Sequence, residues 1–230
     1  MAVIRDTTER KRAERALADF NRKLNLLSGI NRHDILNQLT VLISCLELQR
    51  EMTSDPGPLK NLAKIERSAS IIKEQLEFSR DYEEMGTKTS CWQRLAFIFE
   101  ALPQIKSISS ASMSPQVRRI EVLADPMLGR VLYNLVDNSL RHGGKVGSVS
   151  LDCHQEGEDL VIVYGDDGSG IPLEEKELIF LRGQGKGSGL GLFLSKEILA
   201  ITDIGISEHG RPGKGARYEI RVPSGKYRFV

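Results

Sequence analysis

Apolar residues in the first third of the chain recur at alternating steps of three and four, the spacing of a helical seam. Two such series occur, and the segment TSDPGP at residues 53–58 separates them. Because proline and glycine favour turns, this pattern predicts two antiparallel helices joined by a turn. The seam residues are Ala13, Leu17, Phe20, Leu24, Leu27, Ile35, Leu39, Leu42 and Leu46 in the first helix, and Leu62, Ile65, Ala69, Ile72 and Leu76 in the second.

The two predicted helices form a hairpin, which we place at residues 18–85. Two helices with one apolar seam each do not bury those seams well on their own. Pairing two copies into a four-helix bundle would bury them. We therefore expect a homodimer that forms through the helical hairpin.

After residue 86 the pattern changes to short runs that alternate between apolar and polar residues, as half-buried strands do. Helical patterns near residues 91–102, 126–142 and 190–200 lie between these runs. The combination predicts a mixed sheet with helices on one face, so the fold class is α+β: a long helical hairpin followed by an α/β sandwich. The predicted strands are RRIEVLAD (118–125), VGSVSLDC (146–153), DLVIVYGDD (159–167), ITDIGIS (201–207) and ARYEIRVP (216–223).

Composition and charge argue against several function classes. The 230 residues suit one or two domains, and a net charge of +1 creates no general attraction to nucleic acid or to a membrane surface. No apolar run reaches the ~20 residues that a membrane span needs, and the N-terminus lacks the apolar stretch of a signal peptide. The scattered Cys45, Cys91 and Cys153 are typical of reduced thiols. We therefore expect a cytoplasmic protein with no nucleic-acid partner and no membrane segment.

Three polar segments stand out in the second part of the chain, and the first is NLVDNSLRHGG at residues 134–144. Asn134 and Asn138 are four residues apart, so their amides share one face of the predicted helix. Amide oxygens suit Mg²⁺, which takes oxygen ligands, and Arg141 lies one turn further on, where it could meet a phosphate. Two surface asparagines would fit the same pattern.

The second segment is DDGSGIP at residues 166–172, directly after an apolar strand. Asp166 at the end of that strand could accept a hydrogen bond from an exocyclic amine such as that of adenine. Gly168 and Gly170 would permit a tight turn and the close approach of a planar ligand. A plain Asp-Gly turn explains the segment equally well when it is taken alone.

The third segment is RGQGKGSGLGLFLSKEIL at residues 182–199, where alternating glycines run into a predicted helix. Free N–H groups and the positive dipole end at a helix N-terminus suit phosphates, and Arg182 and Lys186 add positive charge. A glycine-rich linker is the competing interpretation. The GxxxxGK[ST] and GxGxxG patterns are both absent from the chain, so a phosphate site here would belong to neither of those two folds.

A fourth segment, NRHDILNQL at residues 31–39, lies on the first predicted helix. His33 precedes the seam residue Ile35 by two positions, roughly 200° around the helix, so it should point into water. The stripe of polar residues around it is typical of an ordinary solvated face. Nothing within these nine residues decides whether His33 is a nucleophile.

Taken in order, NLVDNSLRHG, DDGSGIP, GKGSGLGL and GKGARYEIRVP resemble the N, G1 and G2 boxes and the final strand of histidine-kinase ATP-binding domains. This is the Bergerat fold, which is shared in outline with gyrase and MutL. HDILN resembles the phosphoacceptor box of the same sensor kinases of two-component systems. VIRDTTERKRAERAL at residues 3–17 is similar to the tail that joins a PAS sensor domain to a kinase core. The resemblance implies a fragment that follows such a sensor, with a connector at 1–17, the phosphotransfer hairpin at 18–85 and the ATP-binding domain at 86–230.

The resemblance also implies a role for each residue of the phosphoacceptor box. His33 would attack the γ-phosphate of ATP through a ring nitrogen. Asp34 matches the acidic neighbour that orients the ring and accepts its proton. Asn37 matches the polar residue one turn on, which in relatives bears on dephosphorylation.

On the nucleotide side, the resemblance implies that ATP and Mg²⁺ are the cofactors. Asn138 matches the Mg²⁺ ligand with Asn134 in support, and Asp166 matches the carboxylate that reads adenine. The implied activity is that of an autophosphorylating histidine kinase that passes its phosphoryl group to an aspartate of a response regulator receiver domain. The implied cofactor-binding residues are Asn134, Asn138, Arg141, Asp166, Gly168, Gly170, Arg182, Lys186, Gly187, Gly189, Leu190 and Gly191.

Two other function classes share parts of this pattern. An ATPase of the same fold could act as a conformational clamp that hydrolyses ATP without phosphorylating itself. An inactive regulatory module could dimerise and dock a partner. The feature that separates them is HDILN on the outward face of a dimerising helix.

Overall fold

The computed structural model describes residues 32–53, 55–184 and 188–230. The chain divides into two compact units, of which the first ends at Glu83 and the second spans Glu84–Val230. The predicted connector at 1–17 lies outside the described residues. So do the seam residues before Ile35, namely Ala13, Leu17, Phe20, Leu24 and Leu27.

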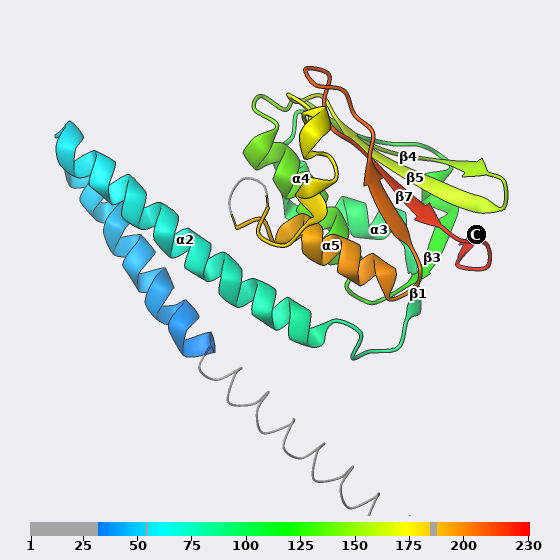
Figure 1. The fold of residues 1–230 in the computed structure, drawn as a ribbon, viewed down its shortest axis with the longest axis horizontal. Helices are drawn as coiled ribbons and strands as arrows, with labels where there is room; N and C mark the ends of the chain where they lie inside the picture. Colours follow the sequence, from blue (N-terminus) through cyan, green and yellow to red (C-terminus); the bar gives the residue numbers. More distant parts are fainter. Residues whose placement is uncertain (1–31, 54, 185–187) are drawn as a thin grey trace, which may run out of the picture. The chain divides into compact units, whose positions relative to one another are not determined.

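The first unit contains a helical hairpin (Figure 1). Residues 32–52 are helical, and α2 follows at Pro56–Glu84. The two helices are antiparallel: Arg50 pairs with Glu66 at 3.6 Å near the turn, and Arg32 pairs with Glu83 at 2.5 Å near the other end. The predicted antiparallel hairpin is therefore confirmed, but α2 already begins at Pro56, within the segment TSDPGP that was predicted as the turn.

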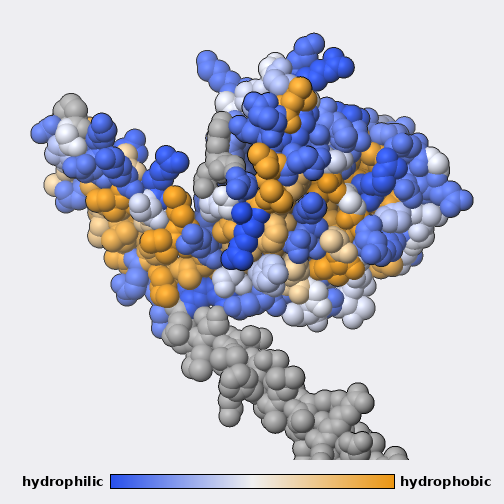
Figure 2. All heavy atoms as spheres, viewed as in Figure 1, coloured by the Kyte–Doolittle hydropathy of each residue, from blue (hydrophilic) through white to orange (hydrophobic). Residues whose placement is uncertain are grey.

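Burial along the hairpin is uneven in the single chain. Leu39 and Ala69 of the predicted seams are buried. The seam residues Ile35, Ile65 and Ile72 remain 45%, 46% and 45% exposed to solvent. Apolar side chains accordingly gather along the surface of the hairpin in Figure 2. One chain alone leaves an apolar stripe of this hairpin half open to water.

The second unit contains a five-stranded sheet with the order β2-β4-β5-β7-β6. β2 runs parallel to β4, and every other neighbouring pair is antiparallel, so the predicted mixed sheet is confirmed. β4 alternates buried and exposed residues along most of its length, which shows that one face of the sheet is covered and the other is open. The strands are β2 Ser110–Met113, β4 Ser148–Glu156, β5 Asp159–Asp166, β6 Gly205–Glu208 and β7 Arg217–Val222.

Three helices lie on the covered side of this sheet (Figure 1): α3 Leu95–Ala101, α4 Leu128–His142 and α5 Gly191–Ala200. α4 turns a strongly apolar face inward, with Leu132 and Leu135 fully buried. The core thus lies between the helices and the sheet, as the α/β sandwich prediction requires. Short 3₁₀ turns occur at Pro103–Ser107, Val117–Arg119, Leu173–Glu175 and Leu178–Phe180.

A second, three-stranded sheet was not predicted. It consists of β1 Cys91–Arg94, β3 Ile120–Ala124 and β8 Tyr227–Phe229, all antiparallel. The strand predicted at 118–125 is β3, so it belongs to this sheet and not to the mixed sheet in which it was predicted. The helix predicted over 91–102 is therefore wrong over its first four residues, which pair with β3 instead. β1, β2 and β8 are three or four residues long, too short for alternation to be visible in the sequence. The strand predicted at 201–207 begins only at Gly205, after a turn.

No helix in the described ranges combines the length and the apolar character that crossing a bilayer requires.

Candidate functional site

Asp166, the last residue of β5, is held by groups from three different elements. Its Oδ2 accepts a hydrogen bond from Ser139 Oγ of α4 at 2.5 Å. Its Oδ1 accepts the backbone N–H groups of Gly168 and Ala216 at 2.9 and 3.0 Å. A carboxylate fixed in this way keeps lone pairs that can accept a further N–H group from a ligand.

A buried tyrosine orients the serine that contacts this carboxylate. Tyr164 Oη lies 2.9 Å from Ser139 Oγ. Burial raises the pKa of Tyr164 well above its usual range, so the phenol remains a donor. Because Ser139 has one hydroxyl proton and gives it to the charged Asp166, the phenol donates to Ser139. Hydrogen bonds that run from Tyr164 to Ser139 and from Ser139 to Asp166 hold the Asp166 carboxylate in one orientation.

The turn after Asp166 is packed too closely for side chains. A Cβ on Gly168 would lie 2.6 Å from the carbonyl oxygen of Gly143, which also accepts the Ser169 N–H at 2.8 Å. Gly170 has φ +69°, and a Cβ there would overlap the carbonyl oxygen of Arg211. The two glycines therefore let the turn lie against the end of α4 and against the loop between β6 and β7.

The two asparagines of α4 differ in their contacts. Asn134 Nδ2 donates to the Gly191 carbonyl oxygen at 2.9 Å and to Ser195 Oγ at 3.1 Å. Asn134 thus ties α4 to the first turn of α5. One turn on, Asn138 has a buried Nδ2 atom with no hydrogen-bond partner among the described residues. A buried amide without a partner is costly, so this position is suited to a ligand.

The side chains present fit a magnesium ion of the kind that nucleotides carry. An asparagine amide can rotate to present its oxygen, and Mg²⁺ is commonly held by one or two protein oxygens together with water and phosphate oxygens. Within the described ranges, no three histidine, cysteine or acidic side chains gather in a way that could hold a metal ion. The Asn138 amide could offer an oxygen to such an ion, and a bound ion would neutralise phosphate charge.

The glycine-rich segment leads into α5. No side chain of the described residues caps α5, and uncapped N–H groups in the first turn of a helix are the kind that bind anions. Gly189 has φ +64°, and its carbonyl oxygen accepts the N–H of Gly183 at 3.1 Å, which closes the loop before the helix. Leu190 precedes the first helical residue, and its carbonyl oxygen accepts the N–H of Leu194.

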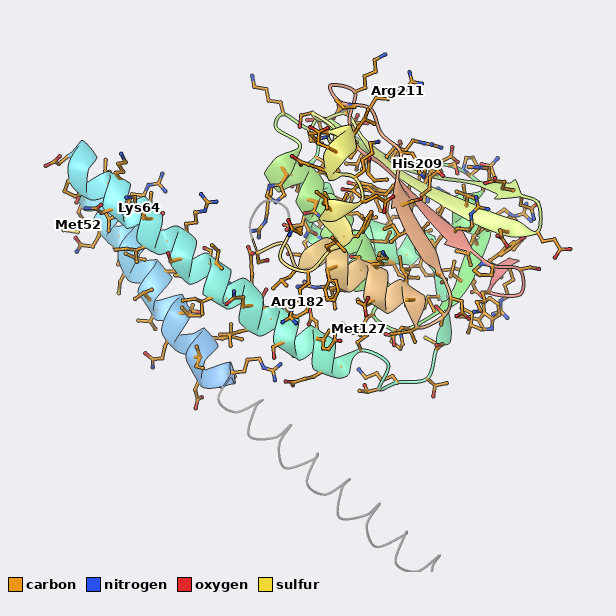
Figure 3. All side chains as sticks on the ribbon, in the orientation of Figure 1. Met52, Lys64, Met127, Arg182, His209 and Arg211 are labelled. Carbon is orange, nitrogen blue, oxygen red and sulfur yellow. The ribbon has the colours of Figure 1, made fainter. Side chains whose placement is uncertain are left out.

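The cationic residues predicted to contact phosphate differ in their surroundings. Arg141 makes an ion pair with Asp137, one turn back on α4, at 2.9 Å. Arg182 lies on the loop that precedes α5 and is labelled in Figure 3. Lys186 and Gly187, which were predicted to contact phosphate, lie outside the described residues.

The histidine of the first unit is open to solvent. The side chain of His33 is 74% exposed, as its position opposite the seam predicts. Its Nδ1 lies 3.2 Å from Asp34 Oδ1 and 3.3 Å from Asn37 Nδ2. Both contacts are made at Nδ1, and Nε2 makes none with the described residues. If Nδ1 donates its proton to Asp34, the lone pair of the ring lies on Nε2, which is then the nucleophilic atom.

Comparison with known proteins finds a family match within the second unit, at residues 124–226. Residues 124–226 match the family model described as histidine kinase-, DNA gyrase B-, and HSP90-like ATPase. This segment is an ATP-binding domain of the histidine kinase type. We refer to the second unit as the ATPase domain from here on.

Curated sensor kinases are similar to the chain over nearly its whole length. The chain is 27% identical to the alginate biosynthesis sensor protein KinB of Pseudomonas aeruginosa, over 96% of the chain and 39% of KinB. It is 26% identical to the signal transduction histidine-protein kinase AtoS of Escherichia coli K12, over 97% of the chain and 39% of AtoS. The chain therefore spans about two fifths of the length of these relatives.

Two solved structures share the fold. Full-length ShkA in complex with AMPPNP has a TM-score of 0.59 at 18% identity, and covers 88% of this chain and 46% of its own. The catalytic domain of histidine kinase ThkA has a TM-score of 0.51 at 22% identity, and covers 60% of this chain and 99% of its own. At these identities the likeness concerns the fold alone.

Sequence reasoning missed Ser139 and Tyr164, which orient Asp166 in the ATPase domain. A signal for Ser139 was available, because this polar residue follows the apolar Leu135 by one helical turn and so falls on the buried face of α4. Tyr164 gave no such signal, since a tyrosine in a buried strand is ordinarily a core residue.

Proposed function

We propose that this chain is the core of a sensor histidine kinase of a two-component system, with residues 18–85 as the phosphotransfer hairpin and 86–230 as the ATP-binding domain. The observation that carries the proposal is the arrangement at His33 in a chain that also contains an ATPase domain. An exposed imidazole is held at Nδ1 by a neighbouring carboxylate, and its Nε2 is left to react. A clamp ATPase would have no use for this arrangement.

In the proposed reaction, the lone pair of His33 Nε2 attacks the γ-phosphorus of ATP. A P–N bond forms, the bond from the γ-phosphorus to the bridging oxygen breaks, and ADP leaves. Asp34 orients the ring and stabilises the positive charge that develops on it through the Nδ1 proton. Phosphoryl transfer depends mainly on positioning and on charge neutralisation, which Asn138, the first turn of α5 and the glycine loop would supply.

The adenine of the nucleotide is proposed to lie at Asp166. The fixed carboxylate would accept a hydrogen bond from the 6-amino group, while Gly168 and Gly170 would let the turn that carries it lie against the end of α4 and the 209–216 loop. Arg141, Arg182 and Lys186 are proposed to contribute positive charge near the phosphates.

The phosphoryl group is proposed to pass from His33 to an aspartate of a receiver domain in a response regulator. The P–N bond is labile, which suits onward transfer, and the open position of His33 leaves room for a second protein. KinB is by name a sensor protein and AtoS a signal transduction histidine-protein kinase. We further propose a homodimer through the hairpin, whose half-exposed seam a second copy would cover, and a cytoplasmic site of action, where ATP is available.

The test is to incubate the chain with ATP labelled at the γ-phosphate and Mg²⁺. We expect label that is stable to base and labile to acid, and we expect its loss in His33→Gln. His154→Gln is the matched control, because His154 is also an exposed histidine but lies on β4. The His154→Gln variant should be labelled as strongly as the wild type. His33→Gln should unfold like the wild type, since the side chain it replaces is largely solvated.

Three other outcomes would contradict the proposal in different ways. ATP turnover without any label would favour the clamp ATPase. A chain that binds no nucleotide would be a regulatory binding module. Label that persists in His33→Gln would place the phosphoacceptor at another residue.

A further inference from the structure

A buried ion pair joins two segments of the ATPase domain near the proposed nucleotide site. Lys176 Nζ lies 2.7 Å from Glu208 Oε2. The Glu208 side chain is fully buried, and that of Lys176 is 15% exposed. Glu208 is the last residue of β6, and Lys176 follows the 3₁₀ turn Leu173–Glu175 after the Asp166–Gly170 turn. Because removing two charges from water is costly, such a pair contributes little net stability and calls for another explanation.

Glu208 holds both ends of the loop at residues 209–216, which connects β6 to β7. Its Oε1 accepts the backbone N–H groups of Gly210 at 2.8 Å and of Arg217 at 3.0 Å. Lys176 Nζ also donates to the carbonyl oxygen of Gly210 at 2.5 Å. A Cβ at Gly210 would lie 2.5 Å from Glu208 Oε1, so this arrangement is closely packed. The ion pair therefore contacts the loop at Gly210, and Glu208 also contacts Arg217 where β7 begins.

The same loop supports Asp166. The N–H of Ala216 donates to Asp166 Oδ1 at 3.0 Å, and the carbonyl oxygen of Ala216 accepts the Asp166 N–H at 3.1 Å. The N–H of Gly213 donates to the Ser169 carbonyl oxygen at 2.7 Å. Arg211, labelled in Figure 3, lies on this loop, and its carbonyl oxygen is the atom that excludes a side chain at Gly170. A shift of the loop would therefore move the carboxylate of Asp166 and the turn behind it.

We propose that Lys176 and Glu208 are positioning residues for nucleobase recognition, because they hold the 209–216 loop so that Asp166 meets the 6-amino group of adenine. The inference rests on the proposed function, since it requires Asp166 to read the base. Neither Lys176 nor Glu208 is required to touch the nucleotide. The pair acts through Glu208 Oε1, the loop backbone and Ala216.

The test compares the binding of two nucleotides to Lys176→Met, which keeps the length of the side chain and removes its charge. One nucleotide is ATP, and the other is purine riboside triphosphate, which lacks the 6-amino group; both are titrated calorimetrically with Mg²⁺. Glu208 would be left buried and unpaired, so the loop should shift. We expect ATP affinity to fall about tenfold, the size of one charge-assisted hydrogen bond, and purine riboside triphosphate affinity to change less than about threefold.

The matched control is Lys226→Met. Lys226 pairs with Asp203 at 2.6 Å in the same domain, but Asp203 is largely exposed, and Lys226 Nζ donates to Asp203 and to the Thr202 carbonyl oxygen, which lie outside the 209–216 loop. This variant should leave the ratio of the two affinities unchanged. A purely structural contribution of Lys176 would weaken both nucleotides alike, because it would reduce the folded fraction without affecting selectivity.

Two further variants keep the inference testable if Lys176→Met does not fold. Glu208→Asp retains the charge pair, but the shorter side chain cannot reach both N–H groups, so the same loss of selectivity is expected. The double variant Lys176→Met with Glu208→Gln removes both charges and keeps an oxygen for those N–H groups, so it should recover the wild-type ratio to within about threefold.

The outcomes separate this inference from the proposed function. A wild type that prefers ATP, with variants that leave the preference unchanged, overturns the role of the ion pair and leaves the kinase proposal in place. A wild type that binds neither nucleotide overturns the proposed function itself. A wild type that binds both equally shows that Asp166 does not read the 6-amino group, which overturns the positioning role as well.

Discussion

The helical hairpin and the ATPase domain bury their apolar residues to very different extents. Ile65 and Ile72 of the hairpin are 46% and 45% exposed, whereas Leu132 and Leu135 of the ATPase domain are fully buried. The ATPase domain completes its core from its own helices and sheet. The hairpin has too few layers to do so, and its half-exposed stripe is the surface that a second copy would cover.

The chemical groups of the two units show the same contrast. His33 is 74% exposed, and its two polar contacts come from neighbours on its own helix. Asp166 is fixed by hydrogen bonds from α4, from its own turn and from the loop before β7. A group that must identify a ligand benefits from a rigid setting, because the correct geometry is then present before binding. A group that must meet both a nucleotide and a second protein has to stay accessible.

The strongest way to break this comparison is to remove the Asn138 amide, whose buried Nδ2 atom has no hydrogen-bond partner among the described residues. Asn138→Ala should reduce labelling by ATP and Mg²⁺ at least about 100-fold, because the transferred phosphoryl loses charge neutralisation by the metal. The fold and the dimer should persist, since Asn138 Nδ2 makes no hydrogen bond with the described residues. Labelling rate is the measurement, with the unfolding midpoint recorded alongside.

Asn138→Asp is the matched comparison for that experiment. It keeps an oxygen ligand at the same position, so labelling should stay within about tenfold of the wild type. Full labelling by Asn138→Ala would show that the metal lies elsewhere.

The next effect concerns the rigidity of the turn behind Asp166. Gly170→Ala places a side chain at φ +69° and against the Arg211 carbonyl oxygen, so it should destabilise the ATPase domain by about 2–4 kcal/mol. Gly225→Ala is the control, because Gly225 has φ +81° but no atom lies within 4 Å of the added Cβ. Backbone strain alone should cost that variant about 1–2 kcal/mol. Urea unfolding of the two variants measures the difference, and equal losses would mean that the turn is not closely packed.

Most of the elements that sequence patterns predicted are long enough to show a period, although the shorter β3, β6 and β7 also overlap predicted strands. The helices of the hairpin, α4 and the strands β4 and β5 each extend over eight or more residues, and their amphipathic patterns placed them within a few positions. The helical pattern near 91–102 includes β1, because α3 begins directly after it at Leu95. β1 forms through pairing with β3, a contact between residues about thirty apart in the sequence. Local sequence patterns do not predict such a long-range pairing.

The candidate site divides in a similar way. Asp166 and its glycines were found because a charged residue and two small residues interrupt an apolar run, which is a local signal. The hydrogen bonds that fix Asp166 come from Ser139 and Ala216, far away in the sequence. The ion pair of Lys176 and Glu208 likewise spans two segments that only the folded sheet brings together. The residues of the candidate site could therefore be predicted from the sequence, but the hydrogen-bond and ion-pair partners that fix them could not.

The smallest expected effect sharpens the contrast in packing. Ile72→Ala removes part of a side chain that the single chain leaves 45% exposed, so it should barely change the packing within one hairpin. In a symmetric dimer the loss occurs twice, and about 1 kcal/mol for each copy corresponds to roughly 10–30-fold weaker association. Ser70→Ala is the control, because Ser70 lies two positions away on α2, about 200° around the helix, and its side chain is exposed. Sedimentation equilibrium over a dilution series measures both variants. An unchanged dissociation constant for Ile72→Ala would mean that the apolar stripe is covered by something other than a second hairpin, and the four-helix bundle would have to be abandoned.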